Sequence, residues 1–311
     1  MSELAFGLAL DLGSTRPLSD QLAAAQPLLN DAVATGVTSV WVGESYHRSP
    51  QAFHLPSALI TLAHLAALTP LRLGTGVLLA RGYHPRRLAY EGALVDQLSG
   101  GRLTLGLGLG TPDLRGGLGG PDRPGGASLD DLLTEVRRSW TAAAPGGADA
   151  PAPVVPAPVQ PGGPKLLVGG QGEAAARRAA TLADGYYAAT NYADELLRAQ
   201  CARYLAHLPE GRSPTIAVNR LCVVDTSADR VRAATEEFGV VTRYYSSRGL
   251  WNIGGSPDGP SPVLAGSFDE VGERLERYRA WGVTQVQLRL LPVGASYRTA
   301  GRTLRLLSEL I

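Results

Sequence analysis

A short cluster of ionisable side chains follows the apolar run SVWVG. Residues 44 to 48 have the sequence ESYHR, the densest set of titratable groups at any predicted strand end. Imidazole exchanges protons near neutral pH, so we predict that His47 transfers a proton and that Glu44 orients it or a cofactor ring. Tyr46 is a candidate substrate contact. The alternative is a solvated loop in which Glu44 pairs with Arg48.

A glycine-rich turn precedes the helical sequence EAAARRAA. Gly170, Gln171 and Gly172 stand where the free amides of a helix N-terminus bind anions, so we predict that they hold a phosphate. The fragment also matches a weak dinucleotide pattern that ends at Ala175. That pattern calls for an acidic residue about 20 positions later, where Asn191 stands instead. A plain tight turn is the remaining interpretation.

The predicted strand 103–109 alternates leucine with glycine. Period-two alternation places the leucines on one face and leaves the other face bare, including Gly108 and the following Gly110. A bare face accommodates a flat cofactor ring. It equally makes room for side chains of neighbouring strands, and the sequence leaves both interpretations open.

The predicted strand 72–79 carries Gly74, Thr75 and Gly76, which we take as further candidates for cofactor contact. Thr75 is suited to a hydrogen bond with a cofactor edge, although threonine is also simply a common strand residue. Arg81 and His84 follow the strand and are candidate substrate contacts. For His84, an exposed loop position at a helix start is the alternative.

Charge and composition narrow the class of partner. The chain has 29 basic and 28 acidic side chains, so we expect a small-molecule substrate and neither nucleic acid nor a membrane surface. No apolar run is long enough to span a bilayer, and the first residues lack the features of a signal peptide. We therefore expect a cytoplasmic protein.

Other kinds of site find little support. The five histidines form no closely spaced ligand set, so we expect no metal site. Cys201 and Cys222 are interpreted as core thiols. A glycosidase needs two facing carboxylates, yet the end of strand 103–109 offers only glycines, with Asp113 beyond them. The chain contains neither a GxSxG elbow nor a Walker loop.

The elements that position these residues alternate between short apolar strands and helices of Ala/Leu-rich sequence. This alternation predicts a parallel sheet covered by helices, and about eight such units predict a (β/α)8 TIM barrel with loop insertions. Active sites of such barrels lie at the C-terminal ends of the strands. The predicted strands are 4–10, 39–43, 72–79, 103–109, 166–169, 186–189, 215–224 and 283–290. The helix after strand 103–109 is predicted to begin after Ser128, which is a suitable N-cap residue.

Three stretches interrupt this rhythm within what we expect to be one domain spanning 1–311. They are the glycine-rich segment 110–126, the Pro/Gly-rich connector 145–164 and the loop insertion 246–262. Long loops in a compact domain are typical of lids and binding loops.

One internal repeat supports the αβ units. The sequences GVTSVWV and GVTQVQL each follow a predicted helix, and we expect Gly36 and Gly282 to end those helices in the left-handed conformation.

These motifs together resemble the luciferase-like monooxygenase family of flavin- and F420-dependent enzymes. The resemblance rests on GVTSVWVGE, LRLGTGVLL, HPRRLAYEGALVDQLSGGRLTLGLGLG and KLLVGGQGEAAARRAATLADGYY, and its most specific part is Val95 to Gly110. It implies a TIM barrel, often dimeric, with a bulge around Gly74 to Val77 that carries the tricyclic ring and a phosphate end near Gly170 to Gly172. In relatives, histidine commonly follows the strand-two acid directly, whereas here Ser45 and Tyr46 intervene before His47.

The resemblance also implies a reaction and its partners. Reduced FMN, supplied by a separate flavin reductase, would react with O2 to oxygenate a small organic substrate. One alternative is hydride transfer with F420, whose anionic tail would meet Arg81, Arg86, Arg87 and Arg115. The other is a flavin-binding protein without turnover.

Overall fold

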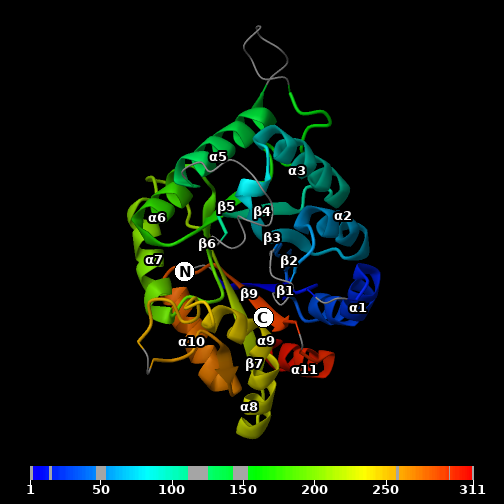
Figure 1. Cartoon of the computed structure of the whole chain (residues 1–311), viewed down its shortest axis with the longest axis vertical. Coiled ribbons are helices and arrows are strands. Elements are labelled where there is room, and N and C mark those ends of the chain that lie inside the picture. The colour runs from blue at the N-terminus through cyan, green and yellow to red at the C-terminus, as the bar shows by residue number, and fades with distance from the viewer. Residues whose placement is uncertain are drawn as a thin grey trace.

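The computed structural model describes residues 3–13, 16–46, 54–110, 125–142, 153–256, 259–293 and 295–309. Eight parallel strands within them close into a barrel, which confirms the predicted (β/α)8 fold (Figure 1). The strands are β1 (Ala5–Leu10), β2 (Ser39–Val42), β3 (Arg72–Leu79), β4 (Leu103–Gly108), β5 (Lys165–Gly169), β6 (Gly185–Ala188), β7 (Ile216–Val224) and β9 (Gln285–Leu291). Their spatial order is β6-β5-β4-β3-β2-β1-β9-β7, and pairing of β6 with β7 closes the ring.

Helices cover the outside of the barrel, as Figure 1 shows. The helices α1 (Leu18–Ala34), α2 (Ala58–Leu68), α3 (Pro85–Ser99), α5 (Gly125–Thr141), α6 (Gly172–Thr181) and α7 (Asp194–Ala206) follow β1 to β6. The helix α10 (Phe268–Ala280) precedes β9, and α11 (Tyr297–Leu307) follows it. Additional elements are the single turn η1 (Ala80–Gly82), α8 (Ala228–Glu237), α9 (Gly239–Ser246) and the short strand β8 (Leu264–Gly266), which pairs with the end of β7.

Strand residues alternate between two buried environments. Leu103, Leu105 and Leu107 of β4 are fully buried in the large cluster that joins the strands to the outer helices. A smaller cluster includes Trp41 of β2 and Tyr187 of β6, together with Ala9, Leu167 and Ala217. Because strands buried on both faces need apolar side chains throughout, they appear in the sequence as continuous apolar runs.

The two repeated corners adopt the predicted conformation. Gly36 has φ 85° and Gly282 has φ 90°, and each follows its helix after one intervening residue. The next amide in each case closes the helix end, since Val37 N donates to Ala32 O at 3.0 Å and Val283 N donates to Tyr278 O at 3.0 Å. The repeat therefore marks two equivalent helix-to-strand corners on either side of β1.

The expected irregularity of β3 is present, because its pairing with β4 shifts register between Thr75 and Leu78. The Thr75 hydroxyl donates to Gly106 O at 2.9 Å and accepts from Gly106 N at 2.8 Å, so it replaces backbone pairing at the shift. A Cβ at Gly106 would lie 2.3 Å from Thr75 O. The absence of a side chain at Gly106 of β4 therefore allows the backbone of β3 to approach closely.

The segment Val95 to Gly110, the most specific part of the resemblance, joins α3 to β4. Asp96 is fully buried and accepts from Gln160 N at 3.0 Å and Gln160 Nε2 at 2.7 Å. Arg102 donates to Ala66 O and Thr69 O, both at 2.8 Å, at the end of α2. These residues tie the strand-start side of the barrel together.

The predicted start of the helix after β4 differs from the structure. We expected the helix after β4 to begin after Ser128, but α5 begins at Gly125, so Ser128 lies inside it. Of the connector 145–164, the described residues 153–164 form neither helix nor strand. The stretch between α9 and β8 holds one isolated bridge, from Ile253 to Tyr192.

Candidate functional site

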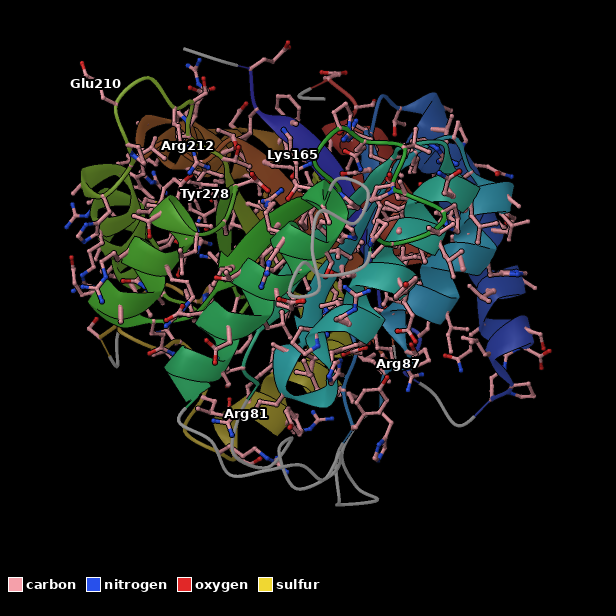
Figure 2. All side chains as sticks on the ribbon, turned by 90° about the horizontal axis from the view of Figure 1, so that it is seen from above. Arg81, Arg87, Lys165, Glu210, Arg212 and Tyr278 are labelled. Carbon is pink, nitrogen blue, oxygen red and sulfur yellow. The ribbon has the colours of Figure 1, made fainter. Side chains whose placement is uncertain are left out.

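A cavity of about 540 Å³ opens at the C-terminal ends of the strands. Figure 2 shows the two ends of the barrel on opposite sides: Lys165, which begins β5, is in the upper half, and Arg81, which follows β3, is in the lower half. Groups after the ends of four strands line the cavity, namely Asp11, Glu44, Gly110 and Gly170. The cavity therefore occupies the place where barrels of this type carry their active sites.

Glu44 joins three segments at this end of the barrel. It is only 5% exposed, and Oε1 accepts from Leu79 N at 2.8 Å. Its Oε2 accepts from Tyr83 Oη at 2.9 Å, and from Ala58 N and Tyr46 Oη at 3.4 Å each. Burial raises the pKa of Glu44 above its usual value, although these four donors oppose the increase.

The other predicted residues of this region are separated by the structure. Tyr46 contacts Glu44 as described, and burial raises its pKa to about 12. Arg81 lies on η1 and His84 is the exposed residue before α3, and neither lines the cavity. His47 lies outside the described residues. Tyr83, which the sequence analysis did not select, is thus the second tyrosine at Glu44.

The predicted anion cradle forms one wall of the cavity. Gly170 and Gln171 line it, and Gly172 begins α6. Gly170 has φ 145° and Gly172 has φ 82°, conformations that favour glycine. Within the described part of the chain, no acceptor is recorded for the backbone amides of Gln171 and Gly172. Free amides at the N-terminus of a helix such as α6 are suited to binding an anionic group.

The strand glycines divide into two groups. Gly76 and Gly108 line the cavity. A Cβ at Gly108 would meet Val77 at 2.9 Å, so a neighbouring side chain accounts for this glycine even beside the cavity. Gly74 does not line it, because the ring of Trp41 lies where its Cβ would be, at 2.3 Å. Thr75 is fully buried and uses its hydroxyl between β3 and β4.

Four polar residues at the cavity floor were not predicted. Arg289 of β9 donates Nε and Nη2 to Asp11 Oδ2 at 2.9 and 2.6 Å, forming a nearly buried ion pair. Asn219 of β7 donates Nδ2 to Tyr187 Oη at 3.3 Å. Burial raises the pKa of Tyr187 to about 12. The signal that would have revealed them is a polar residue inside, or just after, an otherwise apolar strand run.

Aromatic and apolar side chains complete the wall on the α9 side. Tyr244, Tyr245 and Leu250 line the cavity there. The following segment is attached to the loop after β6, since Ile253 N donates to Asn191 O at 3.0 Å and Asn191 Nδ2 donates to Leu250 O at 2.6 Å. Part of the predicted loop insertion therefore closes one side of the site.

Two buried polar atoms of the cavity lining have no hydrogen-bond partner recorded among the described residues. They are Oδ1 of Asn219, whose residue is 8% exposed, and Oγ1 of Thr190, whose residue is 5% exposed. Leaving such a group unpaired costs about 1–3 kcal/mol. A ligand with complementary polar atoms would recover that cost, so the lining fits a cofactor with a polar ring edge and an anionic end.

The described residues show neither a cluster of His, Cys, Asp and Glu placed to hold a metal ion nor a helix suited by length and hydropathy to crossing a bilayer.

The family model of the luciferase-like monooxygenases matches residues 8–285 of the chain. The chain belongs to this family.

Two solved structures share the luciferase-like fold along the whole chain. One is the oxygenating constituent of 3,6-diketocamphane monooxygenase from Pseudomonas putida in complex with FMN, 16% identical, with a TM-score of 0.74 over 100% of this chain and 98% of that one. The other is an F420-dependent secondary alcohol dehydrogenase in complex with an F420–acetone adduct, 16% identical, with a TM-score of 0.76 over the same shares of the two chains.

A curated relative from Acinetobacter baylyi is also similar to this luciferase-like chain. It is the oxygenase component of flavin-dependent trigonelline monooxygenase, 38% identical over 109 residues. The matched segment covers 34% of this chain and 30% of the relative. The similarity is thus local, whereas the family match covers most of the chain.

Proposed function

We propose that this chain is a flavin-dependent monooxygenase that uses reduced FMN and O2 to oxygenate a small organic substrate. The observation that carries the proposal is the combination of free amides at one wall of the cavity with unpartnered polar atoms elsewhere in its lining. A phosphate and the polar edge of a ring are the two features that FMN brings to such a site. When bound, the flavin supplies the reducing equivalents and the reaction with O2.

The residues of the chain bind and orient the cofactor. Gly170, Gln171 and Gly172 hold the phosphate, and the ring lies against the backbone of Gly76 and Gly108, which agrees with their places in or beside the cavity lining. Gly110 also lines the cavity. Gly74 makes room for the ring of Trp41, and Thr75 bonds to Gly106 of β4, so we assign neither residue to the cofactor.

We assign proton transfer in the reaction to the polar residues that follow β2. His47 transfers the proton. Glu44 holds this segment in place through its hydrogen bonds to Leu79, Ala58, Tyr46 and Tyr83. The apolar wall formed by Tyr245 and Leu250 keeps water from the reacting atoms. Replacing His47 with alanine should slow turnover at least 10-fold while FMN affinity stays within about two-fold. Unchanged turnover would remove His47 from the mechanism.

A separate reductase is the proposed source of reduced FMN, and the solution assembly that we propose is a homodimer in the cytoplasm. The relative from Acinetobacter baylyi supports the first point, because its name describes it as the oxygenase component of a flavin-dependent monooxygenase.

Hydride transfer with F420 is the second candidate function. It is favoured by the similarity to the F420-dependent alcohol dehydrogenase and by Arg81, whose buried Nε has no partner recorded among the described residues. Anaerobic titration with reduced FMN and with reduced F420 decides between the two. Our proposal predicts at least 10-fold tighter binding of FMN, and tighter binding of F420 would favour hydride transfer.

Oxygenation itself is tested with isotopically labelled O2. The FMN-loaded protein is reduced, mixed with labelled O2 and a panel of small organic compounds, and examined by mass spectrometry for labelled products. We expect a labelled product that depends on the protein. Flavin oxidation without any labelled product would instead support a binding protein without turnover.

A further inference from the structure

We propose that Tyr186 and Gln200 are positioning residues for the anion cradle. They hold the carbonyl of Gly170 from behind and thereby direct the amide of Gln171 into the cavity, toward the phosphate of the cofactor. This inference rests on the proposed function, because it assigns the two side chains a role in binding that phosphate.

Both side chains converge on one carbonyl oxygen. Tyr186 Oη of β6 donates to Gly170 O at 2.7 Å, and Gln200 Nε2 of α7 donates to the same oxygen at 3.1 Å. Tyr186 and Gln200 are both 0% exposed. Figure 1 shows α6 and α7 side by side next to β5 and β6. Because both side chains are fully buried and neither lines the cavity, they reach the carbonyl from inside the protein.

The geometry of the peptide group converts this contact into a direction for the next amide. The peptide bond after Gly170 is not among the cis bonds of the chain, so its C=O and the N–H of Gln171 point in opposite directions. With the carbonyl held by Tyr186 and Gln200, the N–H faces away from them, and Gln171 lines the cavity. The φ of Gly170 is 145°, which glycine adopts freely and other residues adopt only with strain.

A charged neighbour fixes which end of the Gln200 amide faces the cradle. Arg203 donates Nη1 to Gln200 Oε1 at 2.6 Å, and arginine has no acceptor with which to reverse the bond. Nε2 therefore faces Gly170 O and also lies 3.4 Å from Gly172 O. Arg203 is in turn paired with Glu173 at 3.6 Å. The donor set behind the cradle is thus held in one orientation.

The hydroxyl of Tyr186 keeps its proton near neutral pH and can therefore donate. Burial raises its pKa well above the usual value, so the hydroxyl keeps its proton.

The evidence that a ligand occupies the space in front of the cradle does not depend on the helix N-terminus. It consists of the unpartnered Oγ1 of Thr190 and Oδ1 of Asn219 in the lining of the same cavity.

The test compares FMN with riboflavin, which has the same ring and lacks the phosphate. Dissociation constants of both are measured for the full chain, for Tyr186→Phe and for Gln200→Met. The matched control is Tyr204→Phe, because Tyr204 is also fully buried, its ring lies 6.3 Å from that of Tyr186, and its hydroxyl accepts from Thr215 N. Melting temperatures show that each variant is folded.

We expect Tyr186→Phe and Gln200→Met each to weaken FMN binding about 3- to 10-fold, the size of one lost hydrogen bond, while riboflavin affinity stays within two-fold. Tyr204→Phe should leave both affinities unchanged. If both variants keep the FMN and riboflavin affinities of the unmodified chain, or weaken both by the same factor, the positioning role alone is overturned. Equal affinity of the unmodified chain for FMN and riboflavin would overturn the phosphate site of the proposed function as well.

Discussion

The hydroxyl of Tyr187 on β6 occupies the space that a side chain at Gly76 on β3 would need. A Cβ at Gly76 would lie 2.4 Å from Tyr187 Oη and 3.1 Å from its Cζ. The two residues come from strands that are not neighbours in the barrel, and both line the cavity. Contact across the barrel interior therefore limits side-chain size at Gly76.

This contact predicts a measurable coupling between the two positions. Gly76→Ala should destabilise the protein by about 1–3 kcal/mol, because the added methyl must displace a buried ring. Tyr187→Phe removes the hydroxyl, so the same change should cost at least about 0.5 kcal/mol less in that background. Urea unfolding of the four proteins gives the coupling. Strict additivity would show that the two groups do not compete for space.

A matched glycine provides the control. A Cβ at Gly301 of α11 would meet its nearest neighbour at 3.5 Å, an ordinary contact. Gly301→Ala should therefore be neutral or stabilise the helix by up to about 1 kcal/mol. If Gly301→Ala lowers the free energy of unfolding as much as Gly76→Ala does, the loss at Gly76 cannot be attributed to the contact with Tyr187.

Glu44 should make stability depend on pH. Because burial raises its folded-state pKa, its favourable contribution is complete below the usual value of 4.5 and is lost as pH rises through the raised pKa. The unfolding free energy of Glu44→Gln should therefore increase relative to wild type between pH 4 and pH 8. The exposed Glu273→Gln serves as control. A difference that is constant with pH would contradict the raised pKa.

Asp225 should show the opposite dependence. Hydrogen bonds from Arg230 Nε at 2.7 Å, Ser227 N at 3.1 Å and Arg302 Nη1 at 3.1 Å hold its pKa below the usual value. Asp225→Asn should cost about 1 kcal/mol at pH 7, since the half-exposed arginines are screened by solvent. The cost should begin to shrink as pH falls below 3.8 and should keep shrinking as pH approaches the lowered pKa, and unfolding measurements from pH 2 to pH 7 follow this trend. A cost that is the same at pH 2 as at pH 7 would exclude the carboxylate as its source.

Asn219 should contribute to FMN binding and little to the stability of the fold. Replacing it with leucine removes a buried oxygen without a recorded partner together with the donor to Tyr187 Oη. These two effects oppose each other, so the unfolding free energy should change by no more than about 1 kcal/mol, whereas FMN affinity should fall about 5-fold or more. Gln287→Met is the control, because both amide atoms of Gln287 are also unpartnered in the described chain but the residue does not line the cavity. Unchanged FMN affinity in Asn219→Leu would argue against a ligand at Oδ1.

Sequence patterns predicted the elements well because the signals are local. Strand β3 was predicted with its observed bounds, and the left-handed Gly36 and Gly282 mark helix ends through their own backbone. The start of α5 was wrong, since it lies in a glycine-rich stretch where Ser128 offered an apparent cap. Local capping patterns do not show where such a helix begins.

The site was harder to predict because its contacts join distant parts of the chain. Glu44 stood out at a strand end, but its bond to Leu79 depends on how β2 and β3 are aligned. The ion pair of Asp11 with Arg289 joins residues from the first and last barrel strands. Such pairs form only when the barrel closes, so no single segment contains their signal.

A crystal structure of the protein with FMN tests the central claim most directly. We predict the phosphate within hydrogen-bonding distance of the amides of Gln171 and Gly172, with the ring against Gly76 and Gly108. A phosphate bound elsewhere, or an FMN molecule outside the cavity at the strand ends, would contradict the account.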